Sequence, residues 1–206
     1  KAKARSFSFP FWLGSGSTRG YYLLPYNFLN YAASCKVCNS PLKRDFFPIA
    51  ARRRSLAEPN PRRLLLKERP YLPYPIGELD SDPEELLTFQ GYVCVPVAER
   101  GHDRNRALVT IAFFQLNERD TLLKDRADAV VFTWAMLQRL KQDPNDELGR
   151  QHLERIDMPE FRHANCARSF VRVYRTNRHT ADRYYEKALE YLRPRRHPRL
   201  ASRSLS

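Results

Sequence analysis

The 206-residue sequence predicts an α+β fold that ends in a mainly helical region. Two observations support this class. The first half of the chain holds short apolar runs broken by proline and glycine, which suit short strands and short helices. From Asn117 onward, apolar residues recur at intervals of three and four, as in amphipathic helices. A hydrophobic content of 42%, with 12% aromatic residues, is sufficient for a sizeable core.

In the first third of the chain, residues 1–19 predict irregular structure, residues 21–24 favour a strand, and residues 28–33 fit a helical turn that leads to Cys35. We expect a short helix after Cys38 that runs through Lys43. Residues 51–63 are rich in arginine and proline and predict an exposed loop. Residues 64–73 are punctuated by proline, so they predict an extended segment that cannot be a long helix.

The middle of the chain predicts one short helix and two strands. Asp82 suits a helix N-cap and Pro83 the first helical position. This helix should be short, because residues 89–91 end it. Residues 92–97 and 107–111 are candidate strands, which would pair across the polar turn between them.

The last third predicts three helices. The apolar stripe that begins at Asn117 ends near Asp143, where a proline follows. Two more helices are expected over roughly 159–175 and 180–192, before a basic tail from Pro194. One face of the helix over 159–175 carries three arginines: Arg168, Arg172 and Arg175.

The net charge of +13 is concentrated at the two ends of the chain. Residues 1–63 hold 12 Lys and Arg against 2 Asp and Glu, and residues 160–206 hold 12 against 4. Residues 64–159 are net acidic. Both basic zones also contain aromatic and Asn or His residues, which favours contact with a phosphate backbone. A basic but solvated surface is the alternative.

Several classes of protein are excluded or disfavoured. No run reaches the roughly 18 uncharged apolar residues that a membrane span needs, and we recognise no secretory signal. Four cysteines, two of them in a Cys-x-x-Cys pair, fit a reducing, cytoplasmic compartment better than a disulfide scaffold. With 7 glycines and no glycine-rich phosphate loop, nucleotide hydrolysis by this chain is not expected.

The clearest chemical motif is the pair Cys35 and Cys38, followed by Asn39. Two thiols three positions apart can hold one side of a tetrahedral zinc site. One such pair is half a site, and a reduced, buried pair that only packs is the alternative. Asn39 is either a metal ligand or an ordinary turn residue.

Other candidate residues carry weaker signals. His163 and Cys166 lie one turn apart on a predicted helix and could bind a metal, but packing or surface roles are favoured. Cys94 lies in an apolar strand and is expected to be a small buried hydrophobe. His102 and Asp103 lie in a predicted loop, and we assign them no catalytic role.

The Cys-x-x-Cys pair belongs to a longer pattern of an aromatic lead-in, an Asn, Cys-x-x-Cys-Asn, a Lys and Phe-Pro. Its residues are Gly20-Tyr21-Tyr22, Asn30, Cys35, Cys38, Asn39, Lys43 and Phe47-Pro48. Later segments fit as well, namely residues 68–89, Thr110-Ile111, Leu116-Asn117-Glu118-Arg119, Leu123 and Arg126. Over residues 18–126 the chain resembles a small bacterial HNH endonuclease family, which includes defence-associated nucleases of the retron and Septu type.

The resemblance implies an HNH ββα-metal unit of treble-clef-like form, incomplete at its N-terminal side. Residues 1–63 would form the second half of the HNH and zinc unit with a basic loop, residues 64–126 its α+β continuation, and residues 127–206 a helical region. In the family, an acidic-His motif and another Cys-x-x-Cys precede this segment. No His precedes His102 here, so we expect the upstream half of the motif to lie before Lys1.

By the same resemblance, Asn39 would bind a catalytic Mg²⁺ or Mn²⁺, and Asn30 would orient the general base, a His that the given chain lacks. Cys35 and Cys38 would complete a structural zinc site with an upstream cysteine pair. The residues expected to contact DNA are Lys43, Arg44, Arg52, Arg53 and Arg54.

The expected function is an HNH-type metal-dependent endonuclease that cleaves DNA phosphodiester bonds, as an effector subunit of an antiphage defence system. The expected partners are DNA and an ATPase subunit, with no membrane. Two alternatives stay open. One is a catalytically degenerate HNH-like subunit that binds nucleic acid or serves as a scaffold. The other is a zinc-stabilised module whose basic faces bind an acidic protein.

Overall fold

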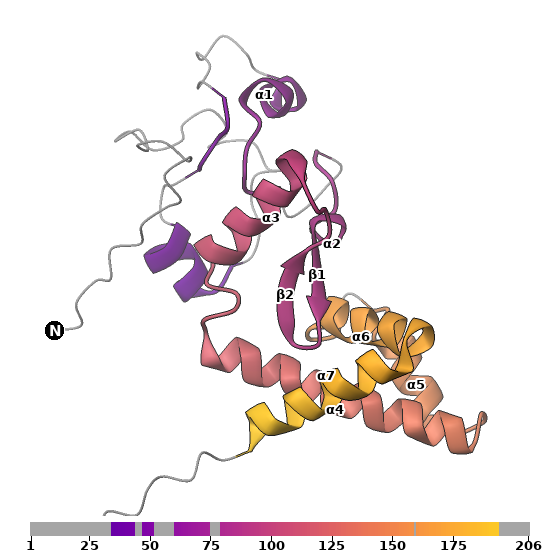
Figure 1. Ribbon diagram of the computed structural model, residues 1–206. Helices are drawn as coiled ribbons and strands as arrows, with labels where there is room; N and C mark the ends of the chain where they lie inside the picture. Colours follow the sequence, from indigo (N-terminus) through magenta and orange to yellow (C-terminus); the bar gives the residue numbers. More distant parts are fainter. Residues whose placement is uncertain (1–33, 44–46, 52–59, 75–78, 159, 194–206) are drawn as a thin grey trace, which may run out of the picture. The chain divides into compact units, whose positions relative to one another are not determined.

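The computed structural model describes residues 34–43, 47–51, 60–74, 79–158 and 160–193. Within these residues the protein is mostly helical, with one small antiparallel sheet, which confirms the α+β class in general terms. The chain divides into two compact units, unit 1 up to Leu123 and unit 2 from Lys124 (Figure 1). The segment boundaries expected from the sequence stay a prediction.

Among its described residues, unit 1 holds a short helical turn, three helices and the sheet. Its elements are η3 (Cys38–Lys43), α1 (Pro61–Glu68), α2 (Pro83–Leu86), β1 (Leu87–Gln90), β2 (Val93–Pro96) and α3 (Gly101–Phe113). Unit 2 begins inside the long helix α4, and its described residues form three more helices. These are α4 (Asp120–Gln142), α5 (Glu147–Arg155), α6 (Ala164–Thr176) and α7 (Arg178–Leu192).

The sheet of unit 1 is a tight hairpin of β1 and β2, which run antiparallel. Gln90 pairs with Val93, so only two residues form the loop. Gly91 opens that loop with a φ of 63°, a conformation that glycine adopts at little cost. The predicted strand at 92–97 is therefore confirmed, but its partner is the segment before it in the chain.

The strand predicted at 107–111 is wrong, because these residues lie in helix α3. The buried residues of α3 include Arg106, Val109, Thr110 and Phe113, which recur at helical intervals. Three β-branched residues, Val109, Thr110 and Ile111, favour a strand locally, yet packing against β2 overrides that local preference.

Helix α1 corrects the prediction over 61–68, where the sequence suggested an exposed loop up to 63 and an extended segment from 64. Residues 52–59 of the predicted loop lie outside the described residues, as do residues 1–33. Asn60 caps α1, because its Oδ1 accepts hydrogen bonds from the backbone N–H groups of Arg62 at 3.0 Å and Arg63 at 3.4 Å. Pro61 takes the first helical position, where its missing N–H costs nothing. Arg69 ends the helix in a left-handed conformation, with a φ of 49°. The extended part of the segment lies beyond this residue.

The short helix α2 is confirmed at its start, where the Asp82 side chain accepts a hydrogen bond from the Glu84 N–H at 2.8 Å and Pro83 follows. The chain then passes directly into β1.

Unit 1 also contains a cluster of buried apolar side chains. Its buried members are Tyr71, Leu72, Val109 and Phe113, and Phe47 and Phe114 pack against them.

A buried ion pair supports the same unit. The Arg106 guanidinium bonds to both carboxylate oxygens of Asp80, and both side chains are almost fully buried. Asp80 also accepts a hydrogen bond from the Tyr74 N–H at 3.1 Å. Because each charge has a partner, the pair fixes α3 against the segment that precedes α2.

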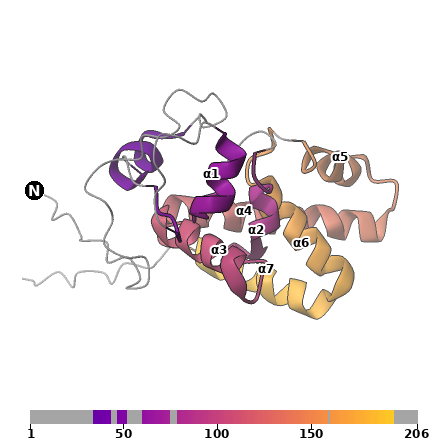
Figure 2. The same ribbon diagram turned by 90° about the horizontal axis from the view of Figure 1, so that it is seen from above.

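Unit 2 is built from helices throughout its described residues (Figure 2). The expected helix that ends near Asp143 is α4, and the two later helices are α6 and α7, which pack against each other. Helix α5 was not expected. Its N-cap is Asp146, whose Oδ1 accepts from the Gly149 N–H at 2.8 Å.

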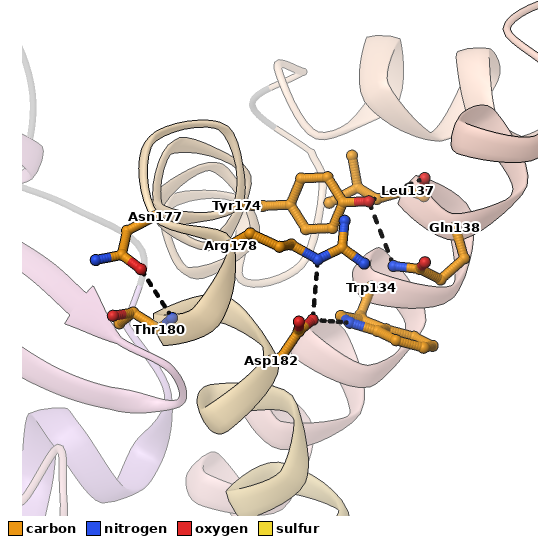
Figure 3. A network of polar contacts seen from close by, with 8 residues as sticks. All are labelled: Trp134, Leu137, Gln138, Tyr174, Asn177, Arg178, Thr180 and Asp182. Carbon is orange, nitrogen blue, oxygen red and sulfur yellow. Dashed lines mark hydrogen bonds and ion pairs between the residues drawn. The ribbon is translucent and has the colours of Figure 1, made fainter.

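A polar and aromatic network joins α4, α6 and α7 (Figure 3). The Trp134 ring stacks on Tyr185, with centroids 3.9 Å apart, while its indole N–H donates to Asp182 at 3.1 Å. Arg178 donates to the same carboxylate and lies over the Tyr174 ring at 3.9 Å. These contacts are specific to one packing of the three helices.

Of the arginines expected on one face of α6, Arg172 and Arg175 are exposed. Arg168 is half-buried, because its guanidinium donates to the Ile156 carbonyl. None of the described helices is both long and apolar enough to cross a membrane.

Candidate metal centre

The Cys-x-x-Cys motif forms a single helical turn. The Asn39 N–H donates to the Cys35 carbonyl at 3.0 Å, which closes the turn. The Cys38 N–H donates to the Cys35 Sγ at 3.4 Å. This N–H···S bond holds the first sulfur over the turn, next to the second cysteine. The predicted short helix through Lys43 is confirmed as η3, which starts at Cys38.

The turn presents its polar groups to solvent. Cys35 and Asn39 are exposed, while Cys38 and Lys43 are half-buried. Neither cysteine forms a disulfide. The expected alternative of a buried packing pair does not fit an exposed Cys35 thiol. The side chain of Asn39 is also exposed, so its amide is accessible to a ligand.

The two thiols differ in acidity. The pKa of Cys35 is lowered from 9.0 to about 7, because hydrogen bonds from the backbone and side chain of Cys38, and from Arg119, favour the thiolate. The pKa of Cys38 is raised, because its partial burial and its neighbour Cys35 disfavour a second negative charge. Near neutral pH the pair therefore carries thiolate character at Cys35, and a thiolate is what metals bind.

A positively charged side chain from a distant part of the sequence contacts the cysteine pair. Arg119 lies between α3 and α4, and its Nη1 donates to the Cys38 Sγ at 3.2 Å. The side chain is half-buried, so its charge is only partly screened by water. The interaction opposes the effect of burial on Cys38, since a guanidinium favours the thiolate.

The segment after η3 is tied to the core of unit 1. The Phe47 ring lies 5.7 Å from the Tyr74 ring, and the Pro48 carbonyl accepts from the Tyr71 N–H at 2.9 Å. Phe47 and Pro48 therefore anchor the downstream end of the segment that carries the cysteines. This gives the Phe-Pro part of the motif a structural role.

A zinc ion fits these residues in part. Two neighbouring thiols, one of them acidic, supply a suitable pair of soft ligands. In the part of the chain that the structure describes, no three His, Cys, Asp or Glu side chains are grouped to hold a metal. The two thiols could supply one side of a tetrahedral zinc site, and further ligands would be needed to complete it.

The other residues predicted for the site cannot be placed. Asn30, Arg44, Arg52, Arg53 and Arg54 lie outside the described residues. Of the predicted set, the structure brings together Cys35, Cys38 and Asn39, with Lys43 at the end of the same short helix.

The weaker candidates take structural places. Cys94 is 2% exposed in β2, which confirms it as a buried hydrophobe. His102 lies in the first turn of α3, not in a loop, and its ring packs on Tyr71. Cys166 is fully buried, and the Nε2 of His163 lies 3.8 Å from the Asp125 carboxylate.

Sequence reasoning missed Arg119 as part of this site. In the sequence it is the last residue of a Leu-Asn-Glu-Arg stretch, 81 positions from Cys38. No spacing rule connects residues so far apart. Comparison with known proteins adds no relative: no family model, no curated protein and no solved structure matches the chain.

Proposed function

We propose that this chain is part of an HNH-type metal-dependent endonuclease that cleaves DNA. The observation that carries the proposal is the exposed turn in which Cys35, Cys38 and Asn39 follow one another, with a short helix leading on to Lys43. Such a turn offers soft ligands on one side and an amide oxygen at the head of a helix. The residue pattern of the HNH family places these same residue types at the same spacing.

In this proposal the two metals have separate roles. Cys35 and Cys38 would hold a structural zinc together with a second pair of thiols, and thereby fasten the turn to the upstream half of the motif. Asn39 would contribute one oxygen ligand to Mg²⁺ or Mn²⁺, ions that prefer oxygen donors. When bound, the catalytic metal neutralises the scissile phosphate and the leaving oxygen.

The remaining parts would come from the chain's own residues and from upstream ones. Asn30 would orient the general-base His that this chemistry requires and that the given chain lacks. Lys43 would lie near a DNA phosphate, and the basic residues Arg44 and Arg52–Arg54 would extend that contact. The concentration of positive charge in residues 1–63 supports binding of a polyanionic ligand by this part of the chain.

The setting of this activity follows from the same proposal. We place the protein in the cytoplasm, as an effector of an antiphage system with an ATPase partner that controls cleavage. A reducing compartment agrees with four free cysteines among the described residues.

Plasmid cleavage by the full-length protein tests the proposal. Supercoiled DNA and a folded RNA of similar length are incubated with Mg²⁺, with Mn²⁺ or with EDTA, with and without the partner subunit. Metal-dependent nicking of DNA supports an endonuclease. DNA binding without cleavage in every metal would instead support the degenerate binding subunit, which is favoured by the lack of any His before His102. The residues that precede Lys1 in the full gene give a second check, since a His-x-x-Pro motif is required there.

A further inference from the structure

The contact between Arg119 and Cys38 joins two segments that lie 81 positions apart in the sequence. Arg119 Nη1 lies 3.2 Å from the Cys38 Sγ, within hydrogen-bond range of a sulfur acceptor. η3 contains no buried residue, so apolar packing does little to hold it. A charged contact with the Cys38 sulfur therefore helps to set where the thiols lie, beside the anchoring of Phe47 and Pro48.

The segment that carries Arg119 is itself firmly placed. Gln115 turns the chain after α3 through a left-handed conformation, with a φ of 51°. Two residues later, the Asn117 side chain bonds to both backbone groups of Cys94 in β2, at 2.9 and 2.8 Å. Arg119 follows and its own N–H donates to the Gln115 carbonyl at 3.3 Å. The guanidinium thus extends from a segment that is fastened to the hairpin.

A guanidinium at this place suits a metal-bound thiolate. Two cysteinates on one divalent zinc leave no net positive charge, and further thiolates make the site anionic. A fixed cation that donates to one sulfur offsets this charge without competing for the metal. Arginine keeps its charge at every relevant pH, and its planar fork holds a defined direction.

We propose that Arg119 is a positioning residue of the zinc site: it holds the Cys38 sulfur in the geometry for metal binding and links the metal to the β1–β2 hairpin through Asn117. The inference rests on the assignment of Cys35 and Cys38 as zinc ligands in the proposed function. It adds a residue near the C-terminal end of unit 1, 81 positions from Cys38. Zinc binding then depends on the segment between α3 and α4.

Metal affinity tests this inference without any measurement of cleavage. The full-length protein is stripped of metal under reducing conditions and titrated with Zn²⁺ in competition with a chelator, and with Co²⁺, whose thiolate charge-transfer absorption reports the cysteine ligands. Four proteins are compared: wild type, Arg119→Ala, Arg119→Lys and Arg139→Ala. The last removes an exposed arginine that bonds to Asp146 in unit 2 and serves as the matched control.

We expect Arg119→Ala to weaken Zn²⁺ and Co²⁺ binding by about 10- to 100-fold, the range seen when a partner of a metal ligand is removed. Arg119→Lys should recover part of the affinity, since it restores the charge without the planar fork. Arg139→Ala should match the wild type. Circular dichroism of each variant confirms that unit 1 stays folded, and the lysine variant keeps the comparison valid if the alanine variant does not fold.

Two results would overturn the inference, and they are distinguishable. If the wild type and both Arg119 variants bind metal equally well, Arg119 has no role in the zinc site. The assignment of the cysteines as zinc ligands would then still hold. A wild-type protein that takes up neither Zn²⁺ nor Co²⁺ would overturn the zinc assignment of the proposed function as well.

Discussion

The Asn117 side chain bonds to Cys94 through both of its polar atoms. Its Oδ1 accepts from the Cys94 N–H at 2.9 Å, and its Nδ2 donates to the Cys94 carbonyl at 2.8 Å. The amide thus takes the place that another strand would take beside β2. It closes this edge of the hairpin and fixes the chain two residues before Arg119.

Loss of this double contact should destabilise unit 1. We expect Asn117→Ala to lower the free energy of unfolding by about 1–3 kcal/mol, because two part-buried hydrogen bonds are removed. Asn117→Asp keeps the acceptor and loses the donor, so its effect should be smaller. Urea denaturation measures both. Asn145→Ala, at an exposed position, should stay within about 0.5 kcal/mol of the wild type. Equal stabilities of the two alanine variants would contradict this role.

The buried pair of Arg106 and Asp80 should be far more sensitive than a surface pair. Asp80→Asn removes the negative charge and leaves the Arg106 guanidinium buried, with 6% of its side chain exposed. We expect a loss of about 3–5 kcal/mol in unfolding free energy. The same change at Asp146, which pairs with an Arg139 side chain that is 47% exposed, should cost far less, because water screens that pair.

Asn can still cap α5 at position 146, so this control isolates the ion pair from the helix cap. Chemical denaturation of the two variants beside the wild type makes the comparison. Similar losses at the two sites would show that burial does not set the cost, contrary to the geometry.

Alkylation should separate the two thiols of the turn. In metal-free protein, Cys35 should react with iodoacetamide with a half-maximal rate at about pH 7, because only its thiolate is nucleophilic and its pKa is lowered to about 7. Cys38 should react only at higher pH, since its pKa is raised and it is half-buried. Mass spectrometry of each peptide over a pH series gives both profiles. Identical profiles for the two cysteines would contradict the asymmetry.

Acid should destabilise unit 2 partly through His152. Burial, and then the nearby Arg155, lower the pKa of His152 below 6.5. Above pH 6.5 the imidazole is neutral in the folded and unfolded protein, so its contribution to stability is fully present. As the pH falls below 6.5, the unfolded state takes up the proton first, and this contribution is lost.

We therefore expect His152→Gln to flatten the fall in unfolding free energy between about pH 6.5 and 5, measured by denaturation at each pH. Glutamine can still bond to the Thr133 hydroxyl, which lies 3.0 Å from the His152 Nε2. His102 and His163, whose pKa values burial also lowers, keep part of the slope. The exposed His179→Gln is the control, and an equal slope in both variants would refute the assignment.

The sequence predicted elements whose signals are local. Asp82 and Pro83 mark the start of α2 because an N-cap and a first-turn proline act on the nearest N–H groups. The same signals, Asn60 with Pro61 and Asp146 with Glu147, were present at α1 and α5 and could have been used. Helix α3 was missed for another reason. One of its buried residues, Arg106, is polar and is buried only because Asp80 pairs with it, so the apolar stripe was incomplete.

In the candidate site, too, the local part could be predicted from the sequence and the tertiary contact could not. The spacing of Cys35, Cys38 and Asn39 describes one helical turn, so their proximity follows from local geometry. Arg119 reaches Cys38 through the tertiary fold, and the described chain between them holds helices α1, α2 and α3 and the β1–β2 hairpin. Local patterns carry no information on such a contact, and only the structure reveals it.

The most direct test of the endonuclease proposal compares Asn39→Ala with the wild type in the full-length protein, under Mg²⁺ or Mn²⁺, with plasmid nicking and bound zinc measured on the same samples. Asn39 is exposed, so its loss should leave the fold intact. The proposal predicts metal-dependent nicking by the wild type, and a loss of nicking in Asn39→Ala with zinc content unchanged. Unchanged nicking by the variant, or no nicking by zinc-loaded wild type with its partner present, would contradict it.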